Sequence, residues 1–361
     1  MKSIKIHGAM DLRIDDYPLE KISSNQVEIS IATGGICGTD LHYYKHGGFG
    51  HIKLKEPMVL GHEVSGHVTK LGPKVTNLSI GQLVSVSPSR PCNKCMFCLE
   101  GNQNHCINMK FYGSAMPFPH IQGAFRERLI AEDYQCVAAD GLSPEEAAMA
   151  EPLAVCLHAI KQAGDIFGKK VLIIGSGPIG TLGVLSARRA GAEEILVTDI
   201  SDKALEFSNL VGADKVINTS KNYPQIEKFQ VGKGYFDLAI ECSGSASGIN
   251  DAIKCLKPKG TLIQLGLGGD ILMPLVSVTT KELNIKGSFR FHSEFELAVK
   301  MMKKKLIDVK PLITHSIPFQ NAEQGFKIAM DEKENSMTVS YTHLRAHETR
   351  GNLVCRLLLE K

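Results

Sequence analysis

The first part of the chain, up to about residue 150, carries short apolar segments that alternate with polar positions. Residues 27–31 and 81–86 show this period of two, bounded by glycine, proline or asparagine, and no helical periodicity is sustained around them. Such alternation is typical of short strands with one buried face. We therefore predict an irregular, β-rich domain over residues 1–150.

From residue 143 onward the pattern changes. Ser143-Pro144-Glu145-Glu146 has the features of a helix start, with Ser143 as the cap and acids in the first turn. Apolar strands are then expected at residues 169–174, 194–199, 236–241 and 261–265, and helices at 181–190, 204–210 and 247–256. Strands that alternate with helices form a parallel, doubly wound sheet. The fold class predicted is α/β, with a Rossmann domain over residues 151–287.

The composition is that of a globular chain of more than one domain. Among 361 residues, 43% are hydrophobic and 22% are charged, which excludes disorder, collagen and coiled coil. The net charge of +3 comes without a long basic run, so we expect no nucleic-acid partner and no membrane surface. No apolar stretch approaches the roughly 18 residues of a membrane span. The N-terminus lacks a signal-peptide pattern, so a cytoplasmic location is expected.

A glycine-rich turn follows the strand at 169–174. Its G-x-G-x-x-G pattern consists of Gly175, Gly177 and Gly180, with Pro178 and Ile179 inside it. In a strand–turn–helix context this predicts a dinucleotide site with the pyrophosphate at the helix N-terminus. Asp199 ends the next strand and is expected to accept hydrogen bonds from the adenosine ribose, which favours NAD. The alternative for Asp199 is a helix cap, and Lys203 leaves NADP open.

Two groups of residues have the features of metal sites. Cys92, Cys95, Cys98 and Cys106 form C-x2-C-x2-C-x7-C in a loop, and four thiolates close a tetrahedron around a structural Zn²⁺. Disulfides or free thiols are the alternative. Cys37, His62 and a carboxylate, Glu63 or Glu151, form a second set that leaves one position open, as a catalytic Zn²⁺ needs. Taken singly, Cys37 is better explained as a small core residue and His62 as a polar turn residue, and it is their joint pattern that favours the metal site.

The order of these motifs resembles a known family. GICGTDLH at 35–42, GHE at 61–63, the four cysteines, EPLAV at 151–155 and GSGPIG at 175–180 follow one another as in the zinc-dependent medium-chain dehydrogenases. The similarity runs from about residue 5 to 338 and is greatest to the polyol branch, which includes the sorbitol dehydrogenases. PSRPC at 88–92, FYGSAM at 111–116, FPH at 118–120 and KGSFRF at 286–291 resemble the L-idonate dehydrogenases within that branch.

The resemblance implies a GroES-like catalytic domain in residues 1–150. Residues 88–110 would be its structural-zinc segment, here called the four-cysteine lobe, and residues 288–339 a return segment that completes the domain. One catalytic and one structural zinc per chain are expected. Both Glu63 and Glu151 occupy positions that the polyol branch uses at the metal, so which of them ligates stays open. Glu151 stands where ethanol-type enzymes have cysteine, which argues against that substrate class.

The resemblance also implies roles for residues near the metal. Thr39 matches a hydroxyl that relays a proton and His42 the acceptor of that proton; a turn hydroxyl and a surface histidine are the alternatives. Tyr43 and Phe118 match residues that line the substrate cleft. Arg290 matches an arginine near the substrate, where it would fork onto a carboxylate, with a domain-interface salt bridge as the alternative. Leu265 and Gly266, after a strand, are expected at the nicotinamide end of the cofactor.

The expected reaction is hydride transfer from a secondary alcohol of a sugar acid or polyol to NAD. Oxidation of L-idonate to 5-keto-D-gluconate is the first hypothesis, and sorbitol or xylitol oxidation the second. A catalytically silent, nucleotide-binding structural protein is a hypothesis of a different class. A zinc-free quinone reductase is disfavoured by the four cysteines. The family further implies a homodimer or homotetramer.

The end of the chain departs from the family. Residues 340–361 run on through SYTHLRAHETR and a leucine-rich stretch. His343 and His347 suggest a metal-binding helix, and the leucines an amphipathic one. Our hypothesis is instead a non-native tail that resembles translated adapter sequence.

Overall fold

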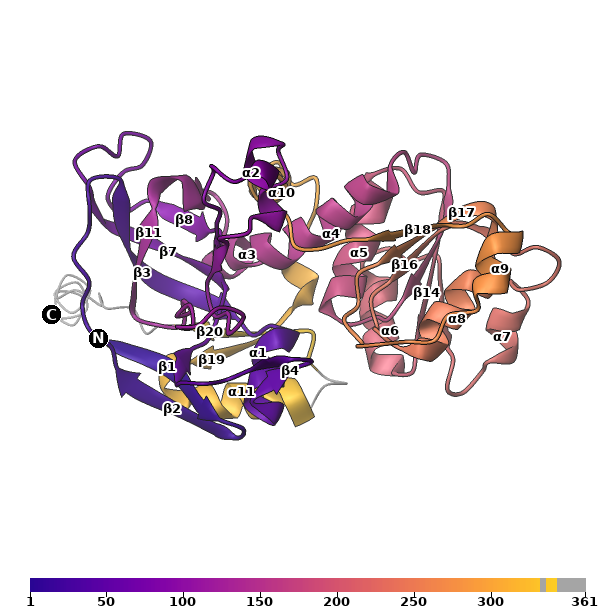
Figure 1. The fold of residues 1–361 in the computed structure, drawn as a ribbon, viewed down its shortest axis with the longest axis horizontal. Helices are drawn as coiled ribbons and strands as arrows, with labels where there is room; N and C mark the ends of the chain where they lie inside the picture. Colours follow the sequence, from indigo (N-terminus) through magenta and orange to yellow (C-terminus); the bar gives the residue numbers. More distant parts are fainter. Residues whose placement is uncertain (332–335, 343–361) are drawn as a thin grey trace, which may run out of the picture.

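The computed structural model describes residues 1–331 and 336–342. Figure 1 shows two halves side by side, a β-rich half that holds the N-terminus and a half built on a parallel sheet. The chain passes from the first half to the second through α4 (Ala150–Ala163) and returns after β18 (Asn284–Gly287). The predicted α/β fold class with a β-rich first part is confirmed.

A bulged strand, β3 (Gln26–Gly35), organises the β-rich half. It pairs with β7 (Glu63–Leu71), β11 (Arg128–Glu132) and β20 (Thr338–Thr342). The sheet continues through β8 (Leu83–Val86), β12 (Cys136–Ala138) and β19 (Ile313–Pro318). Smaller sheets join β2 (Asp11–Asp16), β1 (Lys2–Gly8) and β6 (Met58–Val59), β9 (Ser89–Arg90) with β10 (Lys110–Phe111), and β4 (Gly48–Phe49) with β5 (Ile52–Lys53).

Short helices complete this half. Its α-helices are α1 (Gly38–His46), α2 (Met96–Leu99), α3 (Pro144–Ala148), α10 (Glu294–Lys303) and α11 (Ala322–Asp331). Ser143 caps α3 as predicted, because its hydroxyl accepts from the Glu146 N–H at 3.2 Å. Single 3₁₀ turns lie at Gln103–His105 (η1), Asp133–Gln135 (η2), Lys310–Leu312 (η3) and Phe319–Asn321 (η4). None of the described helices is long and apolar enough to cross a membrane.

The second half has six parallel strands in the order β15-β14-β13-β16-β17-β18, the Rossmann arrangement. Four strands lie close to their predicted positions: β13 (Lys170–Ile174), β14 (Glu194–Asp199), β16 (Phe236–Glu241) and β17 (Leu256–Gln264). The sequence analysis missed the two edge strands, β15 (Lys215–Asn218) and β18. The helices are α5 (Pro178–Arg189), α6 (Asp202–Leu210), α7 (Pro224–Glu227), α8 (Ala246–Cys255) and α9 (Leu275–Thr280).

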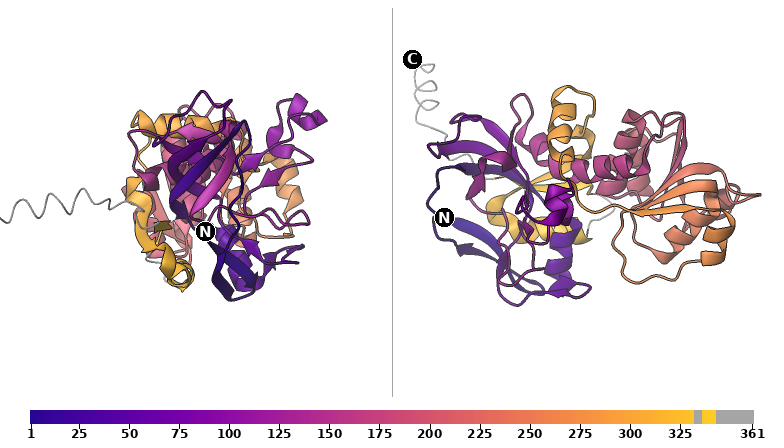
Figure 2. Two further views of the ribbon diagram at one scale, coloured as in Figure 1. Left: turned by 90° about the vertical axis from the view of Figure 1, so that its left-hand side faces the viewer. Right: turned by 45° about the horizontal axis from the view of Figure 1, so that its top comes forward.

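Apolar residues of the parallel sheet pack on both of its faces, in two separate clusters. A third cluster joins α4 with α10 near the junction of the two halves, where Figure 2 shows them side by side. Because α4 contacts β7 and packs on α5, it fixes the β-rich half relative to the glycine-rich turn that precedes α5.

Residues 340–342, the start of the expected tail, belong to β20. They pair with Gly35, Gly34 and Thr33 of β3, and Tyr341 is 1% exposed between Phe125 and Phe326. The Tyr341 hydroxyl donates to the Ala322 carbonyl at 2.6 Å. The hypotheses on His343, His347 and the leucine-rich end fall outside the described residues.

Candidate active site and metal centres

Cys37, His62 and Glu63 meet where β3 ends and β7 begins. Their ligand atoms all lie within 4.8 Å of one another. The register that pairs Gly35 with Glu63 brings the two segments together. A side chain at Gly35 would overlap the Glu63 carboxylate, so this glycine leaves the room that the carboxylate fills. Cys37 lies far from His62 and Glu63 in the sequence, and the pairing of β3 with β7 brings the three residues together.

The electrostatics of this group suit a divalent cation. Burial, reinforced by Asp40, raises the pKa of Glu63 to about 8, and burial followed by the Glu63 charge raises the pKa of Cys37 well above 9. Burial lowers the pKa of His62, whose Nδ1 atom has no hydrogen-bond partner among the described residues. A buried thiol, an unpartnered imidazole nitrogen and a carboxyl group are zinc ligands, and three of them leave an open position. The residues present fit the metal.

Asp40 binds the backbone next to the ligand residues Cys37 and His62, and the sequence analysis did not identify it. Its side chain is fully buried, and its carboxylate accepts from the N–H groups of Cys37 at 3.2 Å and Gly61 at 3.1 Å. It also lies 3.9 Å from His62 Nδ1. Its position three residues after the helix-capping Cys37, as in a capping box, is the signal that was available. Asp40 thereby holds both ligand-bearing segments.

Glu151 lies in the first turn of α4 and is 6% exposed, but its carboxylate is not in the group of three. Burial raises its pKa well above 4.5, and the negative charge of Glu63 raises it further. Arg290 acts in the opposite direction on the pKa of Glu151. Glu63 is therefore the carboxylate that the geometry groups with Cys37 and His62.

Arg290 and Phe111 form a wall beside this group. The Arg290 guanidinium lies 4.2 Å from the centre of the Phe111 ring, and that ring lies 5.6 Å from His62. Burial lowers the pKa of Arg290 to about 10, opposed by the charge of Glu151. Phe111 was not singled out from the sequence, although it lies within the FYGSAM motif. Among the described residues Arg290 forms no ion pair, so the salt-bridge alternative is not supported there.

Tyr43 and Phe118 differ in their surroundings. Tyr43 is 1% exposed, its ring packs edge-on against Phe49, and its hydroxyl accepts from the Ala115 N–H at 3.0 Å. Phe118 is 62% exposed, with the Lys55 ammonium 5.7 Å from its ring centre. Tyr43 is thus part of the packed wall, whereas Phe118 has the exposure of a rim residue.

Thr39 and His42 lie on α1, directly after Cys37. They are three residues apart, so they share one face of the helix. Thr39 is half-buried, and its N–H donates to the Cys37 sulfur, which partly opposes the rise that burial causes in the pKa of that thiol. His42 is exposed and its ring lies 6.2 Å from Phe49. Cys37 and Thr39 are half-buried and His42 is exposed, so this helix face leads from the metal group to solvent.

The glycine-rich turn has the predicted shape. Gly175 has φ of +93°, and a side chain at Gly180 would overlap the Gly175 carbonyl. Gly177 caps α5 and Pro178 occupies its first turn, so the helix starts earlier than the predicted residue 181. Ile179 follows in the same turn, and its carbonyl accepts from the Cys156 thiol at 3.3 Å. Free N–H groups at this helix N-terminus form an anion site.

Asp199 ties the turn to the neighbouring strand. Its carboxylate accepts from Ser176 N–H at 2.6 Å, Ile200 N–H at 2.7 Å and Ser201 N–H at 2.9 Å. The helix-cap alternative is wrong, because the side chain of Ser201 caps α6. Lys203 pairs with Glu206 at 3.2 Å on the surface.

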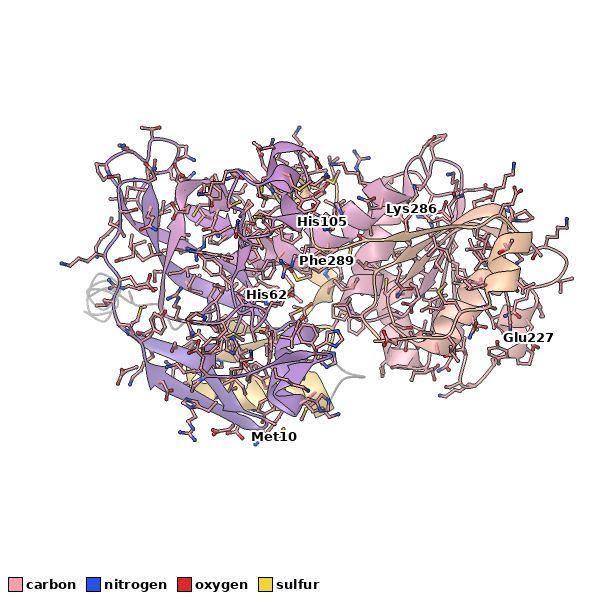
Figure 3. All side chains as sticks on the ribbon, viewed as in Figure 1. Met10, His62, His105, Glu227, Lys286 and Phe289 are labelled. Carbon is pink, nitrogen blue, oxygen red and sulfur yellow. The ribbon has the colours of Figure 1, made fainter. Side chains whose placement is uncertain are left out.

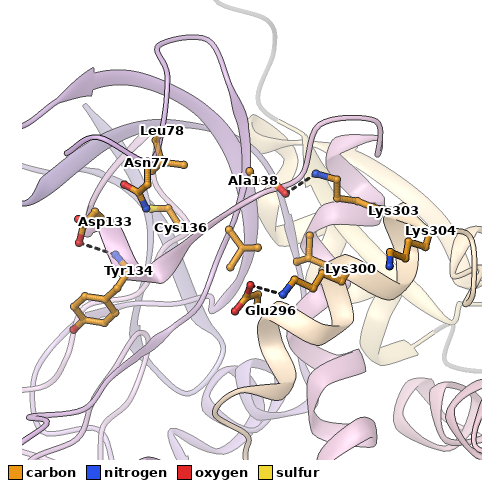
Figure 4. A pocket seen from close by; sticks show the side chains of 12 residues that line it. Asn77, Leu78, Asp133, Tyr134, Cys136, Ala138, Glu296, Lys300, Lys303 and Lys304 are labelled. Carbon is orange, nitrogen blue, oxygen red and sulfur yellow. Dashed lines mark hydrogen bonds and ion pairs between the residues drawn. The ribbon is translucent and has the colours of Figure 1, made fainter.

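Leu265 and Gly266 follow β17, and both donate N–H bonds to the Glu241 carbonyl. They line a cavity of about 350 Å³ together with Leu267, Ser288 and Phe289. A larger groove of about 680 Å³ lies away from this chemistry. Figure 4 shows it between η2, β12 and the lysines of α10.

The four cysteines of the lobe also converge, with all sulfur atoms within 4.8 Å of one another. Among the nine described cysteines every one is free, so the disulfide alternative is wrong for them. The Lys94 N–H lowers the pKa of Cys92 to about 6, and burial raises the pKa of Cys98 to about 12. The Cys92 N–H donates to the Cys106 sulfur at 3.1 Å. Four sulfurs around one point fit a closed, structural zinc site.

Comparisons with known proteins show the family of this chain. Residues 23–141 match the alcohol dehydrogenase GroES-like domain, and residues 178–304 match the zinc-binding dehydrogenase family. L-Idonate 5-dehydrogenase (NAD(P)⁺) of Escherichia coli K12 is 40% identical over 314 residues, which cover 86% of this chain and 90% of that protein. Sorbitol dehydrogenase of Bos taurus is 36% identical over 331 residues, covering 90% and 92%.

A solved structure gives the same result. The crystal structure of L-idonate 5-dehydrogenase from E. coli K-12 superposes with a TM-score of 0.90 at 37% identity, covering 94% of this chain and 97% of that one. Zinc and a nicotinamide dinucleotide are the cofactors of this family, as predicted. The chain therefore belongs to the zinc-dependent medium-chain alcohol dehydrogenases and is an NAD(P)-linked oxidoreductase of polyols or sugar acids.

Proposed function

We propose that this dehydrogenase oxidises a secondary hydroxyl of an aldonic acid, and that its substrate is L-idonate, which becomes 5-keto-D-gluconate. The position of the Arg290 guanidinium is the observation that supports this proposal. Its guanidinium lies against Phe111, next to His62, and its charge acts on the pKa of Glu151. A neutral polyol offers such a cation only uncharged hydroxyl acceptors, whereas a carboxylate carries the opposite charge and accepts two parallel N–H bonds.

Cys37, His62 and Glu63 are the residues that we assign to the catalytic zinc. Their mutual distances and the unpartnered His62 nitrogen support this assignment. Glu151 receives a different role, as a hydrogen-bond partner of the reacting hydroxyl, because it is buried at the same site but outside the group of three. The four cysteines hold the structural zinc.

Zinc bound by these three side chains supplies a Lewis acid that lowers the pKa of the substrate hydroxyl. A nicotinamide dinucleotide held at the glycine-rich turn would supply the hydride acceptor for the carbon that bears this hydroxyl. The hydroxyl proton passes to Thr39 Oγ1, then to the His42 imidazole, and from there to solvent. Their shared helix face and rising exposure support this relay.

NAD is the proposed cofactor, with NADP as the alternative. Gly175, Gly177, Pro178, Ile179 and Gly180 would hold the pyrophosphate. Asp199 would accept from the ribose hydroxyls and repel a 2′-phosphate. Lys203, the nearby cation, is paired with Glu206, which supports the preference for NAD. Leu265 and Gly266 would contact the nicotinamide end.

The test is NADH formation with L-idonate, D-gluconate, sorbitol and xylitol, with NADP⁺ in parallel. For Arg290→Ala we expect the KM for L-idonate to rise roughly 10- to 100-fold, with little change for a neutral polyol, since one charged hydrogen-bonding partner is lost. Lys55→Ala is the matched control, because Lys55 is an exposed cation on the rim beside Phe118. Equal losses on acid and polyol would contradict the proposal.

Two rival functions predict different results. Faster turnover of sorbitol or xylitol than of L-idonate favours the polyol hypothesis. Fewer than two zinc ions per chain, together with no turnover of any substrate, favour the silent structural protein.

We further propose a catalytic unit of residues 1–150 and 288–339, a nucleotide-binding unit of residues 151–287, and assembly as a homodimer or homotetramer. The edge strand β18, exposed at all four residues, supports assembly, and light scattering on the eluting peak tests it.

A further inference from the structure

Arg290 has an unusual backbone conformation. Its φ is +55°, in the left-handed region that residues other than glycine rarely adopt. It comes three residues after the end of β18, in a segment that crosses between the two halves. A non-glycine residue stays in this region only when its surroundings fix it. The neighbours of Arg290 therefore determine where its guanidinium points.

The four-cysteine lobe supplies such a contact. The Asn104 side-chain amide donates to the Phe289 carbonyl at 3.1 Å, and Asn104 is 8% exposed. This carbonyl and the Arg290 nitrogen belong to one planar peptide unit, so a bond to one fixes the orientation of the other. The bond spans 185 positions of sequence and joins the lobe to the segment after β18.

A ring contact from the same 3₁₀ turn adds to this bond. The His105 ring stacks on Phe289 with centroids 6.1 Å apart and an interplanar angle of 29°. Figure 3 shows Phe289 between His105, in the lobe, and His62, in the metal group. Asn104 and His105 belong to η1, and Cys106, one of the four clustered cysteines, follows directly. The cysteine cluster thus fixes the turn that holds Phe289.

The guanidinium of Arg290 completes the connection. It lies 4.8 Å from the centre of the Phe289 ring and 4.2 Å from that of Phe111. Phe111 in turn contacts His62. Asn104 and His105 fix Phe289, and Phe289 and Phe111 hold the guanidinium beside the metal group.

We propose that Asn104 and His105 are positioning residues for the substrate-binding arginine, so that the four-cysteine lobe takes part in recognition of the substrate carboxylate. This inference rests on the proposed function, because it assigns Arg290 to the carboxylate. The lobe then has a second role besides stabilising the fold. It orients the Arg290 side chain, which neither domain orients by itself.

The experiment compares KM and kcat for L-idonate and for a neutral polyol. Asn104→Ala removes the side-chain donor, and the KM for L-idonate is expected to rise about tenfold. The kcat and the KM for the polyol stay within about twofold, because the metal group is untouched. Both zinc ions remain bound. Met96→Ala is the matched control, an exposed residue of the same lobe.

A pair of variants at the neighbouring position separates positioning from folding. His105→Phe keeps a ring on Phe289 and is expected to preserve the KM for L-idonate, whereas His105→Ala raises it. If His105→Ala has no effect, or if both Asn104→Ala and His105→Ala lose zinc and all activity together, the positioning role is wrong.

The two proposals fail in distinguishable ways. If Arg290→Ala impairs L-idonate selectively and Asn104→Ala does not, the carboxylate assignment stands and the role of the lobe is refuted. If Arg290→Ala impairs acid and polyol equally, the proposed function fails, and the inference fails with it.

Discussion

The two candidate metal centres of this protein are built in opposite ways. The four-cysteine lobe takes all its sulfur atoms from one loop of consecutive sequence, and backbone N–H groups of that loop point at them. The group of Cys37, His62 and Glu63 comes from the ends of two strands and depends on their register. The lobe is thus a local structure, whereas the catalytic group is a product of the whole sheet.

Their chemistry follows from this difference. N–H donors in the lobe favour the thiolate of Cys92, and four sulfurs leave no room for a further ligand. Burial and neighbouring carboxyls disfavour ionisation in the catalytic group, which has one ligand fewer. A closed centre suits structure and an open one suits chemistry. The variants below test that contrast, starting with the largest expected effect.

Removal of a ligand from the open group is expected to have the greatest effect. For His62→Ala we predict loss of NADH formation by more than about a hundredfold, which exceeds the usual contribution of an outer-shell partner. Zinc content, measured by atomic absorption, should fall from two per chain to one, and the melting temperature should change little. Persistence of two zinc ions would contradict the assignment.

Removal of one cysteine from the four-cysteine lobe is expected to lower mainly the thermal stability of the protein. For Cys98→Ser we predict loss of the other zinc and a fall in melting temperature of roughly 5 °C or more, because metal binding contributes to folding. Activity on a neutral polyol should largely survive at low temperature. Calorimetry together with zinc analysis checks this, and an unchanged melting temperature would mean that the lobe does not need its metal.

A substitution of Asp40 tests how far zinc binding by Cys37, His62 and Glu63 depends on this buried carboxylate. Asp40→Ala removes the acceptor of the Cys37 and Gly61 N–H groups, and we predict zinc affinity lower by about 10- to 100-fold. Competition with a chelator gives the affinity. Asp11→Ala, which affects an exposed carboxylate paired with Arg13, is the control.

The smallest effect is expected at Gly35. Gly35→Ala places a methyl group against the Glu63 carboxylate, which must shift, and we predict kcat lower by roughly tenfold or less. Gly38→Ala, where a side chain meets open space, should leave the rate unchanged. Equal rates in the two variants would show that the position of Glu63 is not critical.

Much of the fold was predictable because its signals are local. Strand–turn–helix alternation around GSGPIG and the Ser143 cap led to elements within a few residues of their observed ends. The edge strands β15 and β18 were missed, since short strands with exposed residues lack a clear apolar pattern. The family and its cofactors were likewise evident from motif order, whereas the sequence left open whether Glu63 or Glu151 joins Cys37 and His62.

Sequence alone thus determined the metal-binding lobe, the nucleotide-binding turn and the chemical class of the protein. Their residues lie close together along the chain, and backbone geometry converts that spacing directly into a site. Only the tertiary structure decided that Glu63 joins Cys37 and His62, that Phe111 faces Arg290, and that Asn104 reaches Phe289. These pairs depend on strand register and on the packing of distant segments, which local spacing does not encode.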